Sequence, residues 1–249
     1  MKILALIPAR MDSSRFPGKP LKKILNKPMI GHVYDRVRHC NILKQTVVAT
    51  CDQKIADYIS SINGQTVMTG YHHQRATERC AEALKILEKK QKIKYDIIVM
   101  VQGDEPMVHP DMISEVVQPL LNDTEILVTN LFGRIESNDE FKDYNVVKMV
   151  CDLDGNALYF SREPIPNSNY EKNALAGKQY GIIAFQREFL LEYVGMPPTP
   201  LEKAESVDML RIIENGIKIK MILSNNNIYT VDTQADLKMV ERLMSMEIN

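Results

Sequence analysis

A short segment near the N-terminus concentrates cations and hydroxyl groups. Residues 8–20 (PARMDSSRFPGKP) place Arg10, Arg15 and Lys19 within ten positions of one another. Arginine grips phosphate oxygens with a two-pronged fork, and lysine supplies a compact charge. Three cations on one short loop repel each other unless an anion joins them, so the segment predicts a triphosphate-binding loop. A solvated basic turn is the alternative that the residues alone leave open.

Two common nucleotide motifs are absent from the sequence. The cationic segment is not a Walker loop, because GxxxxGK[ST] does not occur, and it is not a dinucleotide fingerprint, because GxGxxG does not occur. P-loop and NAD chemistry are therefore disfavoured.

Two aspartates each follow a short apolar run. Asp104 comes after the run 96–101, and Asp232 comes after 228–231. Ligands of open α/β sheets collect at the carboxyl ends of the strands, and Mg²⁺ prefers hard oxygen ligands. The pair is therefore a candidate magnesium site. A turn aspartate at 104 and a helix-capping aspartate at 232 are the alternatives.

Short apolar runs alternate with amphipathic stretches in the first half, which predicts βα units around a mainly parallel sheet. The expected strands are 3–7, ending at Pro8, and 46–50, 66–68 and 96–101. The expected helices cover 28–39 and begin at Asp52 and Thr77.

The second half is less regular. Its expected strands are 125–131, 146–150, 156–160, 180–185 and 228–231, its helices begin at Thr199 and Thr233, and 163–178 is expected to be a loop or exposed arm. The predicted fold is one α/β domain over 1–249. It has a Rossmann-like, mainly parallel sheet with helices on both faces, and a β-rich insertion or arm at 155–185.

The amino-acid composition limits which kinds of partner and environment the protein has. Among 249 residues, 31 Lys and Arg oppose 32 Asp and Glu, which excludes the strong basic footprint of non-specific nucleic-acid binding. The four cysteines are far apart and are expected to be reduced thiols. No apolar stretch is long enough for a membrane span, and the N-terminal apolar run is too short for a signal peptide, so a cytoplasmic protein is expected.

Ordered motifs along nearly the whole chain resemble those of the 3-deoxy-manno-octulosonate (Kdo) cytidylyltransferases, which belong to the sugar nucleotidyltransferase superfamily. The motifs are Pro8-Ala9-Arg10, Ser14-Arg15-Phe16-Pro17-Gly18-Lys19-Pro20, Lys27-Pro28-Met29-Ile30, Val101-Gln102-Gly103-Asp104-Glu105-Pro106, Val147-Lys148, Ala157-Leu158-Tyr159-Phe160-Ser161-Arg162 and Val231-Asp232-Thr233.

The resemblance implies an enzyme that joins CTP and an acidic sugar into a CMP-sugar and pyrophosphate, with Mg²⁺ held by Asp104 and Asp232. It implies that Lys19 and Arg15 hold the β- and γ-phosphates or the leaving group, and that Arg10 lies near the α-phosphate. These five residues form the predicted catalytic set. The predicted nucleotide-binding residues are Pro8, Ala9, Arg10, Ser14, Arg15, Lys19, Arg75, Ala76, Thr77, Gln102 and Asp104. The predicted sugar-binding residues are Arg162, Gln179, Tyr180, Asp208, Met209 and Asp232. A homodimer is also expected from the resemblance.

The sequence departs from the usual family pattern at several places. His-Gln-Ser-Gly-Thr is here His73-Gln74-Arg75-Ala76-Thr77, Lys-His is Lys178-Gln179, and Glu-Gln is Asp208-Met209. Because a pocket built to hydrogen-bond a hydroxyl discriminates against ligands lacking it, these changes raise the hypothesis of a modified Kdo-like acceptor. The alternative is that these positions have changed in sequence while unmodified Kdo remains the acceptor. At Arg162 the alternative to binding the sugar carboxylate is a surface salt bridge.

Two other functions stay open at this point. A sugar-1-phosphate nucleotidyltransferase would usually have a glycine-rich first loop, and this chain has Pro-Ala-Arg there. A non-catalytic nucleotide-binding module would not need the retained Arg15, Lys19, Asp104 and Asp232.

Overall fold

The computed structural model describes residues 1–12, 16–167 and 176–247. The chain divides into two compact units, Met1–Ser114 with Ile228–Asn249, and Glu115–Asn227. Each unit is described by itself. The prediction of one domain with an insertion at 155–185 stays a prediction.

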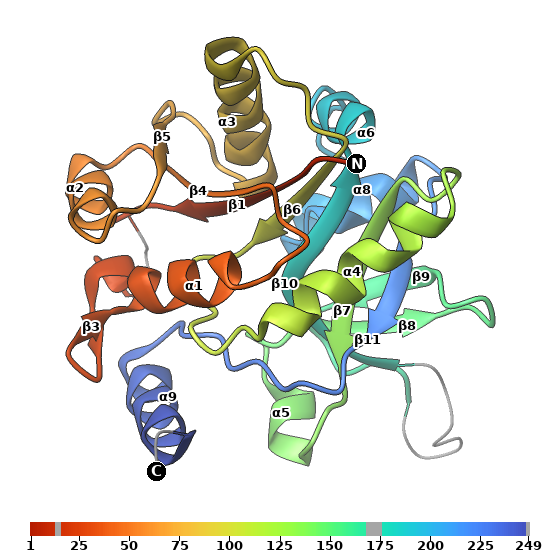
Figure 1. Ribbon diagram of the computed structural model, residues 1–249. Helices are drawn as coiled ribbons and strands as arrows, with labels where there is room; N and C mark the ends of the chain where they lie inside the picture. Colours follow the sequence, from red (N-terminus) through yellow and green to blue (C-terminus); the bar gives the residue numbers. More distant parts are fainter. Residues whose placement is uncertain (13–15, 168–175, 248–249) are drawn as a thin grey trace. The chain divides into compact units, whose positions relative to one another are not determined.

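Unit 1 is built on parallel strands in the order β6-β1-β4-β5. Their bounds are β1 (Ile3–Ala9), β4 (Gln45–Thr50), β5 (Thr66–Met68) and β6 (Ile97–Val101). The helices are α1 (Met29–Arg38), α2 (Gln53–Ser61) and α3 (Ala76–Gln91), with α1 on one side of the strands and α3 on the other (Figure 1). All five residues of β6 are buried, as expected for an apolar strand covered on both faces. The predicted βα alternation of the first half is confirmed.

The first strand is longer than expected. It was predicted to stop at Pro8, but it continues to Ala9, pairing with β4 through Ala49 and Thr50. The pairing of β1 with β6 ends earlier, at Leu6 opposite Met100. Proline lacks only the backbone donor, so it is tolerated where pairing on one side has ended.

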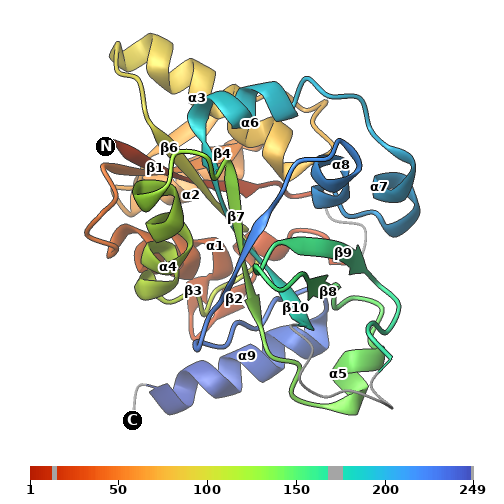
Figure 2. The same cartoon turned by 90° about the vertical axis from the view of Figure 1, so that its right-hand side faces the viewer.

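The C-terminal segment returns to unit 1. Helix α9 (Gln234–Glu247) begins after Thr233, whose Oγ1 accepts the N–H of Asp236 at 3.2 Å, so the predicted helix start is confirmed. Figure 2 shows α9 beside the hairpin of β2 (Lys23–Ile24) and β3 (Lys27–Pro28). The shared core consists of Phe16, Ile24, Met29, Val231, Leu237, Val240 and Met244.

The predicted strand 228–231 is wrong. These residues form no regular element, and the backbone N–H of Val231 donates to the carbonyl of Asp104 at 2.9 Å. The buried side chains of Ile228 and Val231 explain the apolar pattern, because a core position does not require a sheet partner. Strand β11 (Lys220–Leu223), which runs parallel to β7 in unit 2, was not expected, and neither were the short strands β2 and β3.

Unit 2 is β-rich and mainly antiparallel. Strand β10 (Ala176–Gln186) pairs antiparallel with β7 (Val128–Gly133) and β8 (Lys148–Cys151), and β8 pairs with β9 (Ala157–Ser161). Helix α4 (Pro110–Asn122) contains the division between the units after Ser114, and unit 2 also has α5 (Asn138–Lys142), α6 (Arg187–Tyr193), α7 (Pro200–Glu205) and α8 (Met209–Glu214). Within the expected loop 163–178, residues 168–175 lie outside the described residues, and β10 already begins at Ala176.

The four cysteines are free thiols, as expected. Among the described residues, none of the helices combines the length and hydropathy that a bilayer span requires.

Candidate active site

The first strand of unit 1 ends beside the segment that follows β6. A Cβ atom placed on Gly103 would lie 2.9 Å from the carbonyl oxygen of Pro8 and 3.4 Å from the Cβ of Ala9. Only glycine allows this close backbone approach without a shift of the neighbouring strand. Gly103 therefore brings Gln102 and Asp104 to the carboxyl end of β1, where the sequence predicted a nucleotide site.

The Lys19 ammonium joins the two predicted metal ligands. Its Nζ lies 2.5 Å from Oδ2 of Asp104 and 3.0 Å from Oδ1 of Asp232, and it also donates to the carbonyl of Val231 at 3.1 Å. Lys19 follows Gly18, whose positive φ of 73° turns the chain into the short 3-10 helix η1 (Lys19–Leu21). Three segments that are far apart in the sequence therefore meet at one point.

The pair of aspartates fits a divalent cation. The second carboxylate oxygen of Asp104, Oδ1, is buried and has no hydrogen-bond partner among the described residues. Carboxylate oxygens are the hard donors that Mg²⁺ prefers, and Mg²⁺ usually takes only one or two of them from the protein. Within the described part of the chain, no group of three or more His, Cys, Asp or Glu side chains could hold a metal. The donor set therefore suits a cation that completes its shell with water and phosphate oxygens.

Replacing Lys19 with methionine should lower the free energy of unfolding by about 2 kcal/mol between pH 6 and 9, because two nearly buried carboxylates lose their counter-charge. Burial lowers the pKa of Lys19, but Asp104 and Asp232 outweigh burial and raise the pKa above its ordinary value of 10.5. A lysine with a raised pKa stabilises the fold fully below the unfolded pKa, and this contribution is lost as pH rises through the folded pKa. The wild-type advantage in urea unfolding should therefore be constant from pH 6 to 9 and shrink in stronger alkali. An advantage that declines between pH 6 and 9 would contradict this assignment.

Of the predicted nucleotide residues that the structure describes, several lie just after β1 or at the start of helix α3. Arg10 follows β1, and its Nη1 lies 3.4 Å from the carbonyl oxygen of His73. Ala76 is the first residue of α3, so position 76 is helical and needs no left-handed backbone. Thr77 is buried. Ser14 and Arg15 lie outside the described residues, so their predicted roles stay predictions.

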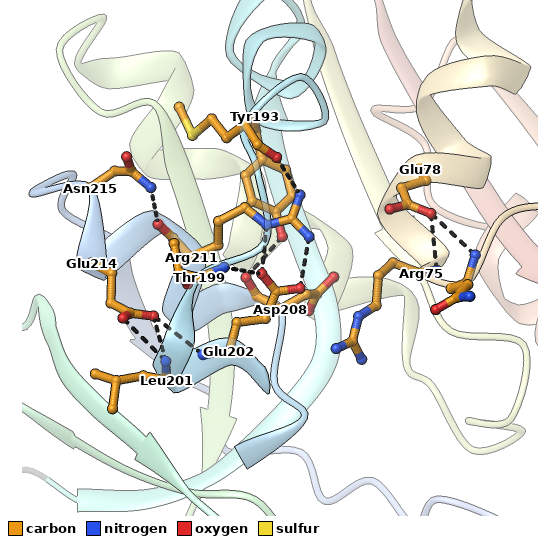
Figure 3. Close-up of polar contacts among 12 residues, drawn as sticks. Arg75, Glu78, Tyr193, Thr199, Leu201, Glu202, Asp208, Arg211, Glu214 and Asn215 are labelled. Atoms are coloured by element: carbon orange, nitrogen blue, oxygen red, sulfur yellow. Dashed lines mark hydrogen bonds and ion pairs between the residues drawn. The ribbon is translucent and has the colours of Figure 1, made fainter. Parts of the chain in front are cut away.

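Arg75 immediately precedes helix α3. Its backbone N–H and that of Gln74 both donate to the carboxylate of Glu78, at 3.3 and 3.1 Å, which fixes the first turn of the helix. The guanidinium of Arg75 points away from this carboxylate (Figure 3).

The predicted sugar residues, apart from Asp232, belong to unit 2. The guanidinium of Arg162 donates from Nε to the carbonyl of Glu205 at 2.8 Å and from Nη1 to the carbonyl of Tyr144 at 3.0 Å. The same group lies over the Tyr144 ring, 5.1 Å from its centroid. Two backbone carbonyls thus orient the guanidinium, and the Glu205 carboxylate accepts the backbone N–H of Arg162 at 2.8 Å.

The other predicted sugar residues differ in how far their side chains are buried. Gln179 is half-buried and donates from Nε2 to Oδ1 of Asn130 at 2.7 Å, whereas Tyr180 is almost fully buried. Met209 is completely buried at the start of α8. The carbonyl of Asp208, which precedes it, accepts the Tyr193 hydroxyl at 2.9 Å (Figure 3). Their roles toward a sugar stay predictions.

The sequence did not point to two groups that contact the predicted site. One is the Val231 carbonyl, which binds Lys19, and the other is Asp52, which accepts the backbone N–H of Met11 at 2.8 Å. A backbone carbonyl gives no signal in a sequence. Asp52 gave a signal, its position just after the second strand, which was interpreted only as a helix start.

Known proteins share both the sequence and the fold. A cytidylyltransferase family model matches residues 4–219. The 3-deoxy-manno-octulosonate cytidylyltransferase of Geobacter metallireducens is 42% identical over 260 residues, covering 100% of both chains. The chain belongs to the 3-deoxy-manno-octulosonate cytidylyltransferase family. The Geotalea daltonii member is also 42% identical, over 98% of both chains.

Solved structures agree with this family. A CMP:2-keto-3-deoxy-manno-octonic acid synthetase in complex with CTP has a TM-score of 0.88 and 36% identity, over 99% of this chain and 100% of that one. A cytidylyltransferase from Leptospira borgpetersenii has a TM-score of 0.66 at 18% identity, over 99% and 87%, which is a likeness of fold alone. The predictions of an α/β nucleotidyltransferase fold and of a nucleotidyltransferase enzyme are confirmed.

Proposed function

We propose that this cytidylyltransferase joins CTP and Kdo into CMP-Kdo and pyrophosphate. The observation that carries the proposal is the meeting of Lys19, Asp104 and Asp232 at the end of β1, in a chain related over its full length to Kdo cytidylyltransferases. In the reaction, the anomeric hydroxyl oxygen of the sugar forms a bond to the α-phosphorus of CTP. The bond from that phosphorus to the bridging oxygen breaks, pyrophosphate leaves, and the hydroxyl proton passes to solvent.

In this reaction the side chains orient the substrates and offset the negative charge of the phosphates. No covalent enzyme intermediate is needed. Phosphoryl-type transfer depends on in-line placement and on neutralising the negative charge spread over the phosphate oxygens. In the proposal Arg10, which follows β1, meets the α-phosphate, and Lys19 meets the phosphates that leave. Arg15 completes this set in the proposal.

The two aspartates are the groups that would hold Mg²⁺. When bound, the ion supplies Lewis-acid stabilisation of phosphate charge. Because the Lys19 ammonium lies against the same two carboxylates, it offsets one of their two negative charges when no other cation is present.

For the acceptor, Arg162 is the proposed partner of the sugar carboxylate. Its contacts with two backbone carbonyls hold the guanidinium in place, so little side-chain freedom is lost when an anion binds. Gln179, Tyr180, Asp208 and Met209 remain the predicted contributors to sugar selection.

A pyrophosphate-release assay tests the proposal. The purified protein with Mg²⁺ is offered CTP, UTP, ATP or GTP, each with Kdo, with an amino derivative of Kdo, with N-acetylneuraminate, with a hexose 1-phosphate or without a sugar. We expect release from CTP with Kdo, at least about a hundredfold above any other nucleotide, because a site that hydrogen-bonds the base rejects one whose groups do not match. Faster turnover of the amino sugar would instead favour a modified acceptor. Pyrophosphate release with sugar 1-phosphates alone would overturn the proposal.

Two further expectations stay predictions: a homodimer and a cytoplasmic location. Light scattering coupled to gel filtration tests the first, with twice the chain mass of 28.5 kDa as the expected result. Fractionation of cells that express the protein tests the second.

A further inference from the structure

Asp52 occupies the N-cap of α2 but does not cap it. Aspartate at an N-cap normally accepts the backbone N–H of the second or third helical residue, and losing that bond costs stability. In this chain the Asp52 side chain makes no such bond. Its Oδ2 instead accepts the backbone N–H of Met11 at 2.8 Å, across 41 positions of sequence.

Met11 in turn closes the loop that leads to Lys19. The carbonyl of Met11 accepts the N–H of Gly18 at 2.9 Å, and Gly18 directly precedes Lys19. Arg10 directly precedes Met11. One carboxylate oxygen therefore holds the backbone at the point that sets the positions of both Arg10 and Lys19.

The Asp52 side chain is itself fixed. Its backbone N–H donates to Oγ1 of Thr50 at 3.1 Å, and the Cys51 thiol donates to the same Oδ2 at 3.5 Å. Burial raises the pKa of Cys51, and the neighbouring charge of Asp52 adds to this effect, so the thiol keeps the proton that it donates. These contacts orient the carboxylate toward Met11 and away from its own helix.

We propose that Asp52 is a positioning residue for nucleotide binding, which acts by holding the backbone of Met11 and so pre-organising Arg10 and Lys19 for a triphosphate. The inference rests on the proposed function, because it takes these two cations as the phosphate-binding groups. A negative charge near a phosphate site is itself unfavourable, so the useful property of Asp52 is its acceptor oxygen rather than its charge.

Three variants separate this role from a structural one. Asp52→Asn keeps an acceptor oxygen at the same reach. Asp52→Ser provides an equally good N-cap for α2 but is too short to reach Met11. Ser137→Ala, in unit 2, is the matched control, because Ser137 does cap its helix by accepting the N–H of Glu140 at 3.1 Å.

CTP binding is measured by isothermal titration without sugar, and stability by thermal melting. We expect Asp52→Ser to weaken CTP binding about tenfold, the order expected when one hydrogen bond that positions the phosphate-binding backbone is lost. Its melting temperature should stay within about 2 °C of wild type. Asp52→Asn should bind CTP within about twofold of wild type, and Ser137→Ala should melt earlier with unchanged CTP affinity.

Unchanged CTP affinity in Asp52→Ser would overturn the inference while leaving the proposed function intact. Equal weakening in Asp52→Asn and Asp52→Ser would also overturn it, because the charge would then be the property that matters. Failure of the wild type to bind CTP would remove the proposed function and this inference with it.

Discussion

Replacing Asp104 or Asp232 with asparagine should lower kcat for CMP-Kdo synthesis by roughly 10²–10⁴-fold, the range seen when a main charge-stabilising group is removed from an active site. Asparagine has the shape of aspartate but lacks the negative charge that a divalent cation requires. The amide oxygen of each variant can still accept from Lys19, so the fold is expected to survive. Steady-state pyrophosphate release at saturating CTP and Kdo measures the loss.

The matched control for these variants is Asp111→Asn. Asp111 is also in unit 1, but its side chain is 76% exposed and pairs with His109 at the surface. It should retain wild-type kcat. Manganese binding, followed by electron paramagnetic resonance in the presence of CTP, should weaken in both active-site variants and not in the control. Wild-type turnover by both Asp104→Asn and Asp232→Asn would remove these residues from the reaction.

Replacing Glu202 with alanine should lower the free energy of unfolding by about 3–5 kcal/mol, the usual cost of leaving one partner of a buried ion pair uncompensated. Arg211 donates from Nε and Nη2 to the two carboxylate oxygens of Glu202, each at 2.7 Å, and the two side chains are 3% and 1% exposed. Figure 3 shows this pair with the ring of Tyr193 beside the guanidinium, whose carbon lies 5.1 Å from the ring centroid.

Changes in pH should not rescue the Glu202 variant. The hydrogen bonds that Arg211 donates to Glu202 raise the pKa of Arg211 and outweigh burial, which lowers it. Without those bonds the guanidinium is still charged at every accessible pH, because an arginine does not lose its proton in proteins. Urea unfolding at pH 6 and pH 9 should therefore give the same loss of stability.

Two further variants test whether the unpaired charge of Arg211 causes the loss of stability in Glu202→Ala. Glu188 forms an exposed pair with Arg187, its own side chain being 77% exposed, so Glu188→Gln should change stability by less than about 1 kcal/mol. The double variant Glu202→Ala with Arg211→Met should recover most of the loss, because no unpaired charge then remains buried. A double variant no more stable than the single one would show that packing, and not the unpaired charge, carries the effect.

Much of unit 1 could be predicted from the sequence, because its signals are local. Apolar runs as short as 96–101 favour strands covered on both faces, and the amphipathic stretches between them indicate the βα order. The cationic loop and the two aspartates were also recognisable, since each has a residue type that serves phosphate or metal chemistry and stands just after an apolar run.

Contacts over long sequence separations were decided only by the tertiary structure. The bonds of Lys19 to Asp104 and Asp232 span 85 and 213 positions, and no periodicity encodes such a pairing. The helix start at Thr199 was predicted, yet the pairing of Glu202 with Arg211 follows from how α7 and α8 pack. The run 228–231 has the composition of a strand, but it lies in a core without a ladder. Local pattern determines which face of a segment is buried, and only the packed chain determines what that face meets.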